Sequence, residues 1–216
     1  SDVYKRQVRL VQQPDRAVGG RTVRRAYPLC LRQGQRYNGH THNNSTAWTA
    51  ADSLPGTAGS YYLTQSVSSD WTVPTGEVNL CLNGQTINGK ITVGSGATLT
   101  LTDCTGTGKL QGSRSGSGVS INGGTFNLYG GTITGFVNGV EIGSHNDIKT
   151  GSSFTMYGGT ITSNEAGSSA GGGVFLISTT NSTVTAPSFT MHGGTISNNT
   201  AGASDGGAGA VYVGEK

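Results

Sequence analysis

Long hydrophobic runs, proline and charge are all scarce in this sequence of 216 residues. No apolar run reaches about 18 residues, so the sequence encodes no transmembrane helix. Five prolines stand beside 37 glycines, and glycine does not recur at every third position, which excludes a collagen-like chain. Charged residues make up only 12% of the chain, which disfavours a disordered chain. Short triplets of Val, Ile, Leu and Phe among Gly, Ser, Thr and Asn predict many short strands joined by tight turns.

Cysteine and clustered metal ligands are scarce as well. Cys30, Cys81 and Cys104 give no even disulfide framework and no CxxC motif. Cys81 and Cys104 can pair only if the fold brings them together, which the sequence does not decide. The histidines are scattered apart from His40 and His42, and this pair stands in a Gly- and Asn-rich stretch typical of a solvated linker. We therefore expect neither a metal site nor a cofactor.

Positive charge is confined to the N-terminal segment. Residues 1–36 contain nine Lys and Arg against two Asp and Glu, whereas the rest of the chain contains five against nine. A basic arm can bind nucleic acid, but no recognised nucleic-acid fold accompanies it, so we expect no nucleic-acid partner. We predict that residues 1–37 are a disordered or non-native segment. Residues 38–60 are expected to form a linker and N-terminal cap, and residues 61–216 the folded repeat region.

A repeat dominates the sequence from residue 78 onward. FTMYGGTITSN (154–164) returns as FTMHGGTISNN (189–199), and FNLYGGTITGF (126–136) is a looser copy. Two earlier segments align with these. One begins its apolar triplet at Leu80 and has Ile87 at the position of the Ile in Thr-Ile, and the other begins at Leu99 and has Gly106 there. Further apolar triplets stand between the segments, at 91–93, 119–121, 140–142, 174–176 and 211–213. Self-similarity at intervals of roughly 20 to 35 residues indicates a solenoid.

Each repeat contains three short strand patterns and no helix pattern. An apolar-polar-apolar triplet points two side chains to one face and one to the other. Three triplets per turn, with their apolar side chains inward, make a triangular coil whose core is completed by the coils above and below. Stacked coils pair their strands in parallel, about 4.8 Å apart. Because parallel crossovers are right-handed, we predict an all-β, right-handed parallel β-helix of five to six coils.

The style of the repeat resembles a known group of surface proteins. SLPGTAGSYYLTQSV, NLCLNGQTING, ITVGSGATLTLTDC and the F-x-M-x-GGTI units are similar to the right-handed parallel β-helix region of adhesin-like bacterial cell-surface proteins of the gut Firmicutes type. The likeness covers about residues 38–213. It implies a pectate-lyase-like architecture, secretion, and display on the cell wall or cell surface. It also implies a stalk or an adhesive, carbohydrate-binding module whose partners are glycans or surface proteins, and it supplies no catalytic motif.

One aligned position in the repeat carries rings. Tyr129, Tyr157 and His192 each follow the second apolar residue of a triplet. In stacked coils they would form an outward ladder with about 5 Å per step. Such a ladder can stack sugar rings while neighbouring Asn and Thr side chains form hydrogen bonds, or it can simply stabilise the sheet. These three residues are the candidate ligand-binding site.

Two other functions stay open as alternatives. A polysaccharide-acting lyase or glycosidase needs clustered carboxylates, or carboxylates beside a Lys or Arg base. The acidic residues of the repeats stand singly in their segments: Asp103, Glu141, Asp147, Glu165 and Asp205. Ice binding could use the stacked Thr-Ile-Thr segments at 132–134 and 160–162, but Asn88 and Ser197 interrupt that array, and Thr is favoured on exposed strands generally. Because the acidic residues are not clustered in the sequence, we predict a protein without catalysis.

Two further expectations concern the turns and the C-terminal end. Asn164, Asn198 and Asn199 follow the Thr-Ile strand, and we predict an Asn ladder that satisfies turn carbonyls. The sequence stops at AVYVGEK, directly after a triplet that should pair with a following coil. Because an open last coil exposes unpaired edge groups, we expect further coils beyond Lys216 and regard the sequence as a fragment.

Overall fold

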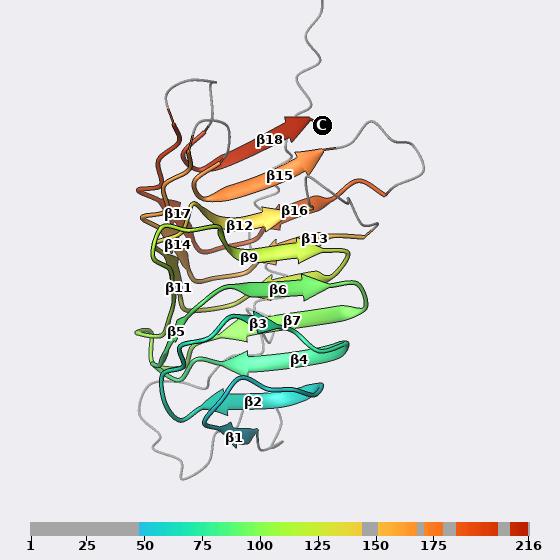
Figure 1. Cartoon of the computed structure of the whole chain (residues 1–216), viewed down its shortest axis with the longest axis vertical. Coiled ribbons are helices and arrows are strands. Elements are labelled where there is room, and N and C mark those ends of the chain that lie inside the picture. The colour runs from blue at the N-terminus through green and yellow to red at the C-terminus, as the bar shows by residue number, and fades with distance from the viewer. Residues whose placement is uncertain (1–47, 144–150, 168–170, 179–184, 203–207, 216) are drawn as a thin grey trace, which may run out of the picture.

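The computed structural model describes residues 48–143, 151–167, 171–178, 185–202 and 208–215 (Figure 1). Within these ranges the chain is all-β, without a helix, and its strands form three sheets in which all paired strands are parallel. No helix in this part of the chain could cross a membrane. The predicted basic segment 1–37, the His40 and His42 pair, and the acidic residues Asp147 and Asp205 lie outside the described residues.

The three sheets run along the long axis of the molecule (Figure 1). The first contains β1 (Thr49–Ala51), β2 (Gly59–Leu63), β4 (Gly76–Cys81), β7 (Ala97–Thr102), β10 (Thr125–Leu128), β13 (Ser153–Met156) and β16 (Ser188–Met191), in that order. The second contains β5 (Thr86–Asn88), β8 (Lys109–Gln111), β11 (Thr132–Thr134), β14 (Thr160–Thr162) and β17 (Thr195–Ser197). The third contains β3 (Trp71–Thr72), β6 (Ile91–Gly94), β9 (Ser117–Asn122), β12 (Asn138–Ile142), β15 (Val174–Ser178) and β18 (Val211–Glu215).

The chain visits the three sheets in turn. From β4 onward, three consecutive strands contribute one strand to each sheet, and we call such a set a repeat unit. The repeat units are β4–β6, β7–β9, β10–β12, β13–β15 and β16–β18. Before them, β2, a bridge between Val67 and Ile87, and β3 touch the same three sheets. This order is consistent with the predicted parallel β-helix.

The inward side chains form continuous files, as predicted. Phe126 pairs with Phe154, and Phe154 with Phe189, in the register of the first sheet. Their rings are stacked, with centroids 5.1 Å and 5.0 Å apart. Phe126 and Phe154 are fully buried, whereas Phe189 in the last repeat unit is only partly buried. Each file is therefore complete only where a repeat unit has neighbours on both sides.

The predicted alignment of the first repeat unit was wrong by two residues. β4 pairs with β7 so that Val78 lies opposite Leu99 and Leu80 opposite Leu101. The sequence alignment had matched Leu80 with Leu99. A shift of two residues leaves the same face of the strand inward, so the alternation of apolar and polar residues could not reveal it. Leu82, which follows β4, is buried as well and made the wrong triplet look complete.

The alignment of the second repeat unit was also wrong. Leu110 of β8, and not Gly106, lies opposite Ile87 and Ile133 in the second sheet. Leu110 is fully buried and fills the column that the isoleucines fill elsewhere. The longer turn before it is held by the Asp103 carboxylate, which accepts hydrogen bonds from the backbone N–H groups of Gly84 and Gly108, both at 2.8 Å.

The Gly-Gly pair marks the corner between the first and second sheets. Its second member adopts a left-handed conformation, with φ of 79° at Gly159 and 93° at Gly194. A Cβ atom on Gly159 would lie 2.9 Å from the carbonyl oxygen of Gly131 in the preceding repeat unit. Both the conformation and the close approach of the backbones therefore require glycine here.

The predicted Asn ladder is confirmed for two of its three members. Asn164 is buried; its Oδ1 accepts from Phe136 N at 3.0 Å, and its Nδ2 donates to Asn199 Oδ1 at 2.9 Å. Asn199 Nδ2 in turn donates to the carbonyl oxygen of Ile161 at 2.9 Å. Asn198 does not belong to the ladder. It is exposed and left-handed, with φ of 54°, a conformation that Asn tolerates better than most residues.

The fold brings Cys81 and Cys104 together, which the sequence left undecided. Their Sγ atoms lie 2.9 Å apart. Cys81 is fully buried, whereas Cys104 is half-buried in the turn after β7. Burial raises the pKa of the Cys81 thiol from 9.0 to about 12.

The file of Phe rings predicts a large cost for a cavity at its centre. We expect Phe154→Ala to lower the free energy of unfolding by about 3–5 kcal/mol, because the ring is buried between two others. Thr155→Ala on the outward face of the same strand is the control and should change it by less than about 0.5 kcal/mol. Chemical denaturation of both variants measures this. Equal losses would contradict the inward packing of Phe154.

The raised pKa of Cys81 predicts a loss of stability at high pH. In the reduced protein the thiol ionises near pH 9 when unfolded and near pH 12 when folded. Its contribution is therefore intact below pH 9 and is lost at about 1.4 kcal/mol per pH unit between pH 9 and pH 12. The Cys81→Ala variant has no thiol to ionise at this position. The difference in unfolding free energy between the wild-type protein and this variant should therefore narrow between pH 9 and pH 12. A constant difference would show that the thiol ionises normally.

Candidate functional site

The predicted ring ladder exists at the corner between the first and second sheets. Tyr129, Tyr157 and His192 directly follow β10, β13 and β16. The rings of Tyr129 and Tyr157 stack with centroids 4.4 Å apart, and those of Tyr157 and His192 with centroids 5.0 Å apart. Tyr129 and Tyr157 are half-buried and His192 is exposed. We call these three residues the ring column; their stacking is confirmed, and their role in ligand binding stays a prediction.

The backbone and the stacking decide what the ring column can offer a ligand. His192 N donates to Met156 O at 2.7 Å, and Tyr157 N donates to Leu128 O at 2.8 Å, so successive rings are tied to adjacent repeat units. The interplanar angles are only 10° and 16°. Because nearly parallel rings at this spacing cover one another's faces, the Tyr157 ring offers a ligand its edge and its phenol group. Sugar stacking is then limited to the ends of the ring column.

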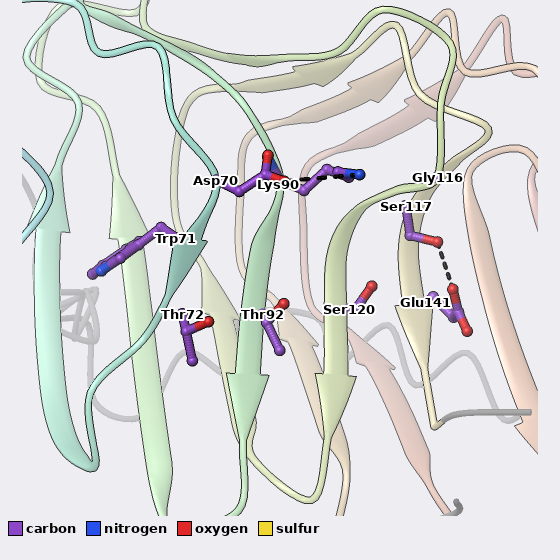
Figure 2. Close-up of a pocket in the computed structure, with 9 residues that line it drawn as sticks. All are labelled: Asp70, Trp71, Thr72, Lys90, Thr92, Gly116, Ser117, Ser120 and Glu141. Carbon is purple, nitrogen blue, oxygen red and sulfur yellow. Dashed lines mark hydrogen bonds and ion pairs between the residues drawn. The ribbon is translucent and has the colours of Figure 1, made fainter. Parts of the chain in front are cut away.

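A second candidate lies on the outward face of the third sheet. It is a groove of about 450 Å³ that crosses β3, β6, β9 and β12 (Figure 2). We call it the polar groove, and its lining residues are Asp70, Trp71, Thr72, Lys90, Thr92, Gly116, Ser117, Ser120 and Glu141. The volume lies within the range of known small-ligand sites. The sequence did not predict this groove.

A row of hydroxyl groups forms the centre of the polar groove. Strand register places Thr72 opposite Thr92, and Thr92 opposite Ser120, on three adjacent strands (Figure 2). The flanking residues of Thr92, Ile91 and Val93, are fully buried, so the alternation of the strand points Thr92 outward. No residue that the structure describes forms a hydrogen bond with the hydroxyls of this row. Each hydroxyl can therefore both donate to and accept from a ligand.

Charged side chains border the row of hydroxyls. Lys90 Nζ lies 3.8 Å from Asp70 Oδ2, and Lys90 N donates to Asp70 Oδ1 at 2.8 Å. Glu141 lies opposite Ser120 and continues the row (Figure 2). Its Oε2 accepts a hydrogen bond from Ser117 Oγ at 2.5 Å. The groove thus carries two carboxylates and one ammonium group, a net charge of −1.

Large side chains end the polar groove on one side. In the next repeat units the row continues with Phe175, which lies opposite Glu141, and then with Tyr212, which lies opposite Phe175. Their rings are stacked with centroids 5.8 Å apart. At the other end the indole of Trp71 is buried and donates through Nε1 to Pro55 O at 3.0 Å, so its ring is turned away from the groove. Small outward side chains beside the bulky Phe175 and Tyr212 therefore explain the hollow.

The other residues that the sequence offered for catalysis or ice binding have structural roles or do not lie near one another. Glu165 pairs with Arg114, and Asp103 holds a turn, so neither joins Glu141. Within the described residues no group of three or more His, Cys, Asp or Glu side chains could hold a metal ion. The stacked Thr-Ile-Thr segments do pair in register, but Lys109 and Gln111 replace their threonines in the preceding repeat unit.

The sequence did not reveal that Asp70 pairs with Lys90, because the two residues stand in segments that do not resemble each other. Both residues directly precede a strand of the third sheet, at Trp71 and Ile91, which face each other in register. Aligning the third triplet of each repeat would therefore have brought them together. The polar groove combines hydroxyls, carboxylates and an ammonium group suited to a hydroxyl-rich ligand. No family model, no curated protein and no solved structure matches this chain.

Proposed function

We propose that this chain is part of a secreted bacterial surface protein that binds carbohydrate without catalysis. In this proposal a right-handed parallel β-helix forms a stalk, displayed on the cell wall or cell surface, and the polar groove on its third sheet holds a glycan. The strict alternation among three parallel sheets supports the β-helix, and the handedness of parallel crossovers supports the right-handed winding. The extracellular setting rests on the likeness of the repeat to adhesin-like surface proteins.

The main support for the proposal is the row of hydroxyl groups that form no hydrogen bond with the described residues. Thr72, Thr92 and Ser120 stand about 4.8 Å apart on adjacent strands, in a hollow of about 450 Å³. Saccharides present hydroxyl groups at intervals along a chain, and each can exchange hydrogen bonds with a protein hydroxyl. A regular sheet supplies such partners without a loop having to order on binding, which keeps the entropic cost low.

The arrangement of charge supports binding over catalysis. Glycoside hydrolases use two carboxylates in different roles. In the polar groove the Asp70 carboxylate is engaged by Lys90, both through its ammonium group and through its backbone N–H. Glu141 therefore stands without a second uncommitted carboxylate among the lining residues.

A glycan array run beside polysaccharide degradation assays tests this proposal. We expect the protein to bind saccharides without releasing products. The double variant Thr92→Val and Ser120→Ala should bind roughly thirtyfold more weakly, because two hydrogen bonds worth about 1 kcal/mol each are removed. Thr155→Val, on the outward face of the first sheet, is the matched control and should bind normally.

The same array separates the ring column from the polar groove. His192→Ala removes the exposed ring, and a loss of binding in this variant alone would assign recognition to the ring column. Released oligosaccharides would favour the enzyme instead. Absence of binding to any saccharide would refute the proposal.

A further inference from the structure

The polar groove contains a negative charge that no cation of the described chain balances. The ion pairs within the described residues are Lys90 with Asp70 and Arg114 with Glu165. Glu141 takes part in neither, although it is half-buried. We propose that the polar groove selects a saccharide with a free amino group, a hexosamine, and that Glu141 binds the ammonium group. This inference rests on the proposed binding of glycans in the polar groove.

The geometry of Glu141 suits this role. It lies on β12 between Val140 and Ile142, which are both fully buried, so its side chain points out into the groove (Figure 2). Ser117 donates to Oε2 at 2.5 Å and fixes the carboxylate at the wall of the groove. A carboxylate has about four lone-pair sites on its two oxygens. Oε1 and the remaining site on Oε2 are therefore available to an N–H donor.

The charge of the polar groove distinguishes three classes of sugar. Lys90 is already paired with Asp70, so an anionic sugar such as a uronate would meet the uncompensated carboxylate of Glu141. A neutral or N-acetylated sugar would form hydrogen bonds but would leave that charge unpaired. An ammonium group would neutralise it through a charge-assisted hydrogen bond, which is stronger than a neutral one.

The row of hydroxyls gives the ligand a direction. Thr72, Thr92 and Ser120 lead across the sheet to Glu141, because these four residues occupy consecutive places in the strand register. A saccharide lying along the row would place ring hydroxyls against Thr92 and Ser120, and its amino group against Glu141. Phe175, directly beyond Glu141, ends the row on that side.

Titration calorimetry with three oligosaccharides of equal length tests the inference: a glucosamine oligomer, its N-acetylated form and a galacturonate oligomer. We expect the glucosamine oligomer to bind most tightly, and its affinity to fall with added salt because salt screens the ion pair. Glu141→Gln should weaken its binding about tenfold and leave the N-acetylated oligomer nearly unaffected. Glu77→Gln on β4 removes the same charge from the first sheet and should bind the glucosamine oligomer normally.

The outcomes separate this inference from the proposed function. Equal weakening by Glu141→Gln and Glu77→Gln would mean that the attraction is a general effect of net charge, and would overturn the role of Glu141. Neutral oligosaccharides that bind as tightly as the glucosamine oligomer, and still depend on Thr92 and Ser120, would overturn the amine preference but keep the proposed function. If none of the three bound, the preference for an amino sugar would be overturned, whereas the proposed function would be judged by the glycan array.

Discussion

Each inward side chain of this protein packs against the equivalent side chain of the repeat units before and after it, because the strands pair in parallel and in register. Phe154 is buried since Phe126 and Phe189 cover its two faces. Phe189 has a described neighbour on one side only and remains partly exposed. A single repeat unit therefore has no core of its own, and its stability is an interaction between units.

The same register arranges the outward side chains into rows. These residues take no part in the inward files, so the rows can differ from one sheet to the next. The third sheet carries hydroxyls, a carboxylate and then rings, and this change of size along one row creates the polar groove. The small side chains of Thr92 and Ser120 leave a hollow in the surface, whereas the stacked rings of Phe175 and Tyr212 occupy the corresponding space further along the row.

The sequence predicted the features that repeat and failed where repeats differ. The files of Phe, the stacking of Tyr129 on Tyr157, and the contact between Asn164 and Asn199 follow from near-identical segments. The early units have no Gly-Gly pair to fix the phase, and a shift of two residues preserves the inward face. The polar groove escaped detection because Asp70, Lys90 and Glu141 lie far apart in the sequence, and only the strand register shows that they share one hollow.

The ring column and the polar groove both arise from the stacking of repeat units, but they differ in what they leave available to a ligand. In the ring column each face of Tyr157 lies against a neighbouring ring, so the attraction that a sugar would exploit already holds the column together. In the polar groove the hydroxyls of Thr72, Thr92 and Ser120 have no partner among the described residues, and the charge of Glu141 has no counterion there. Recognition requires groups whose interactions are not yet made. We therefore prefer the polar groove as the candidate binding surface, and we infer that the ring column chiefly stabilises the stacked repeat units.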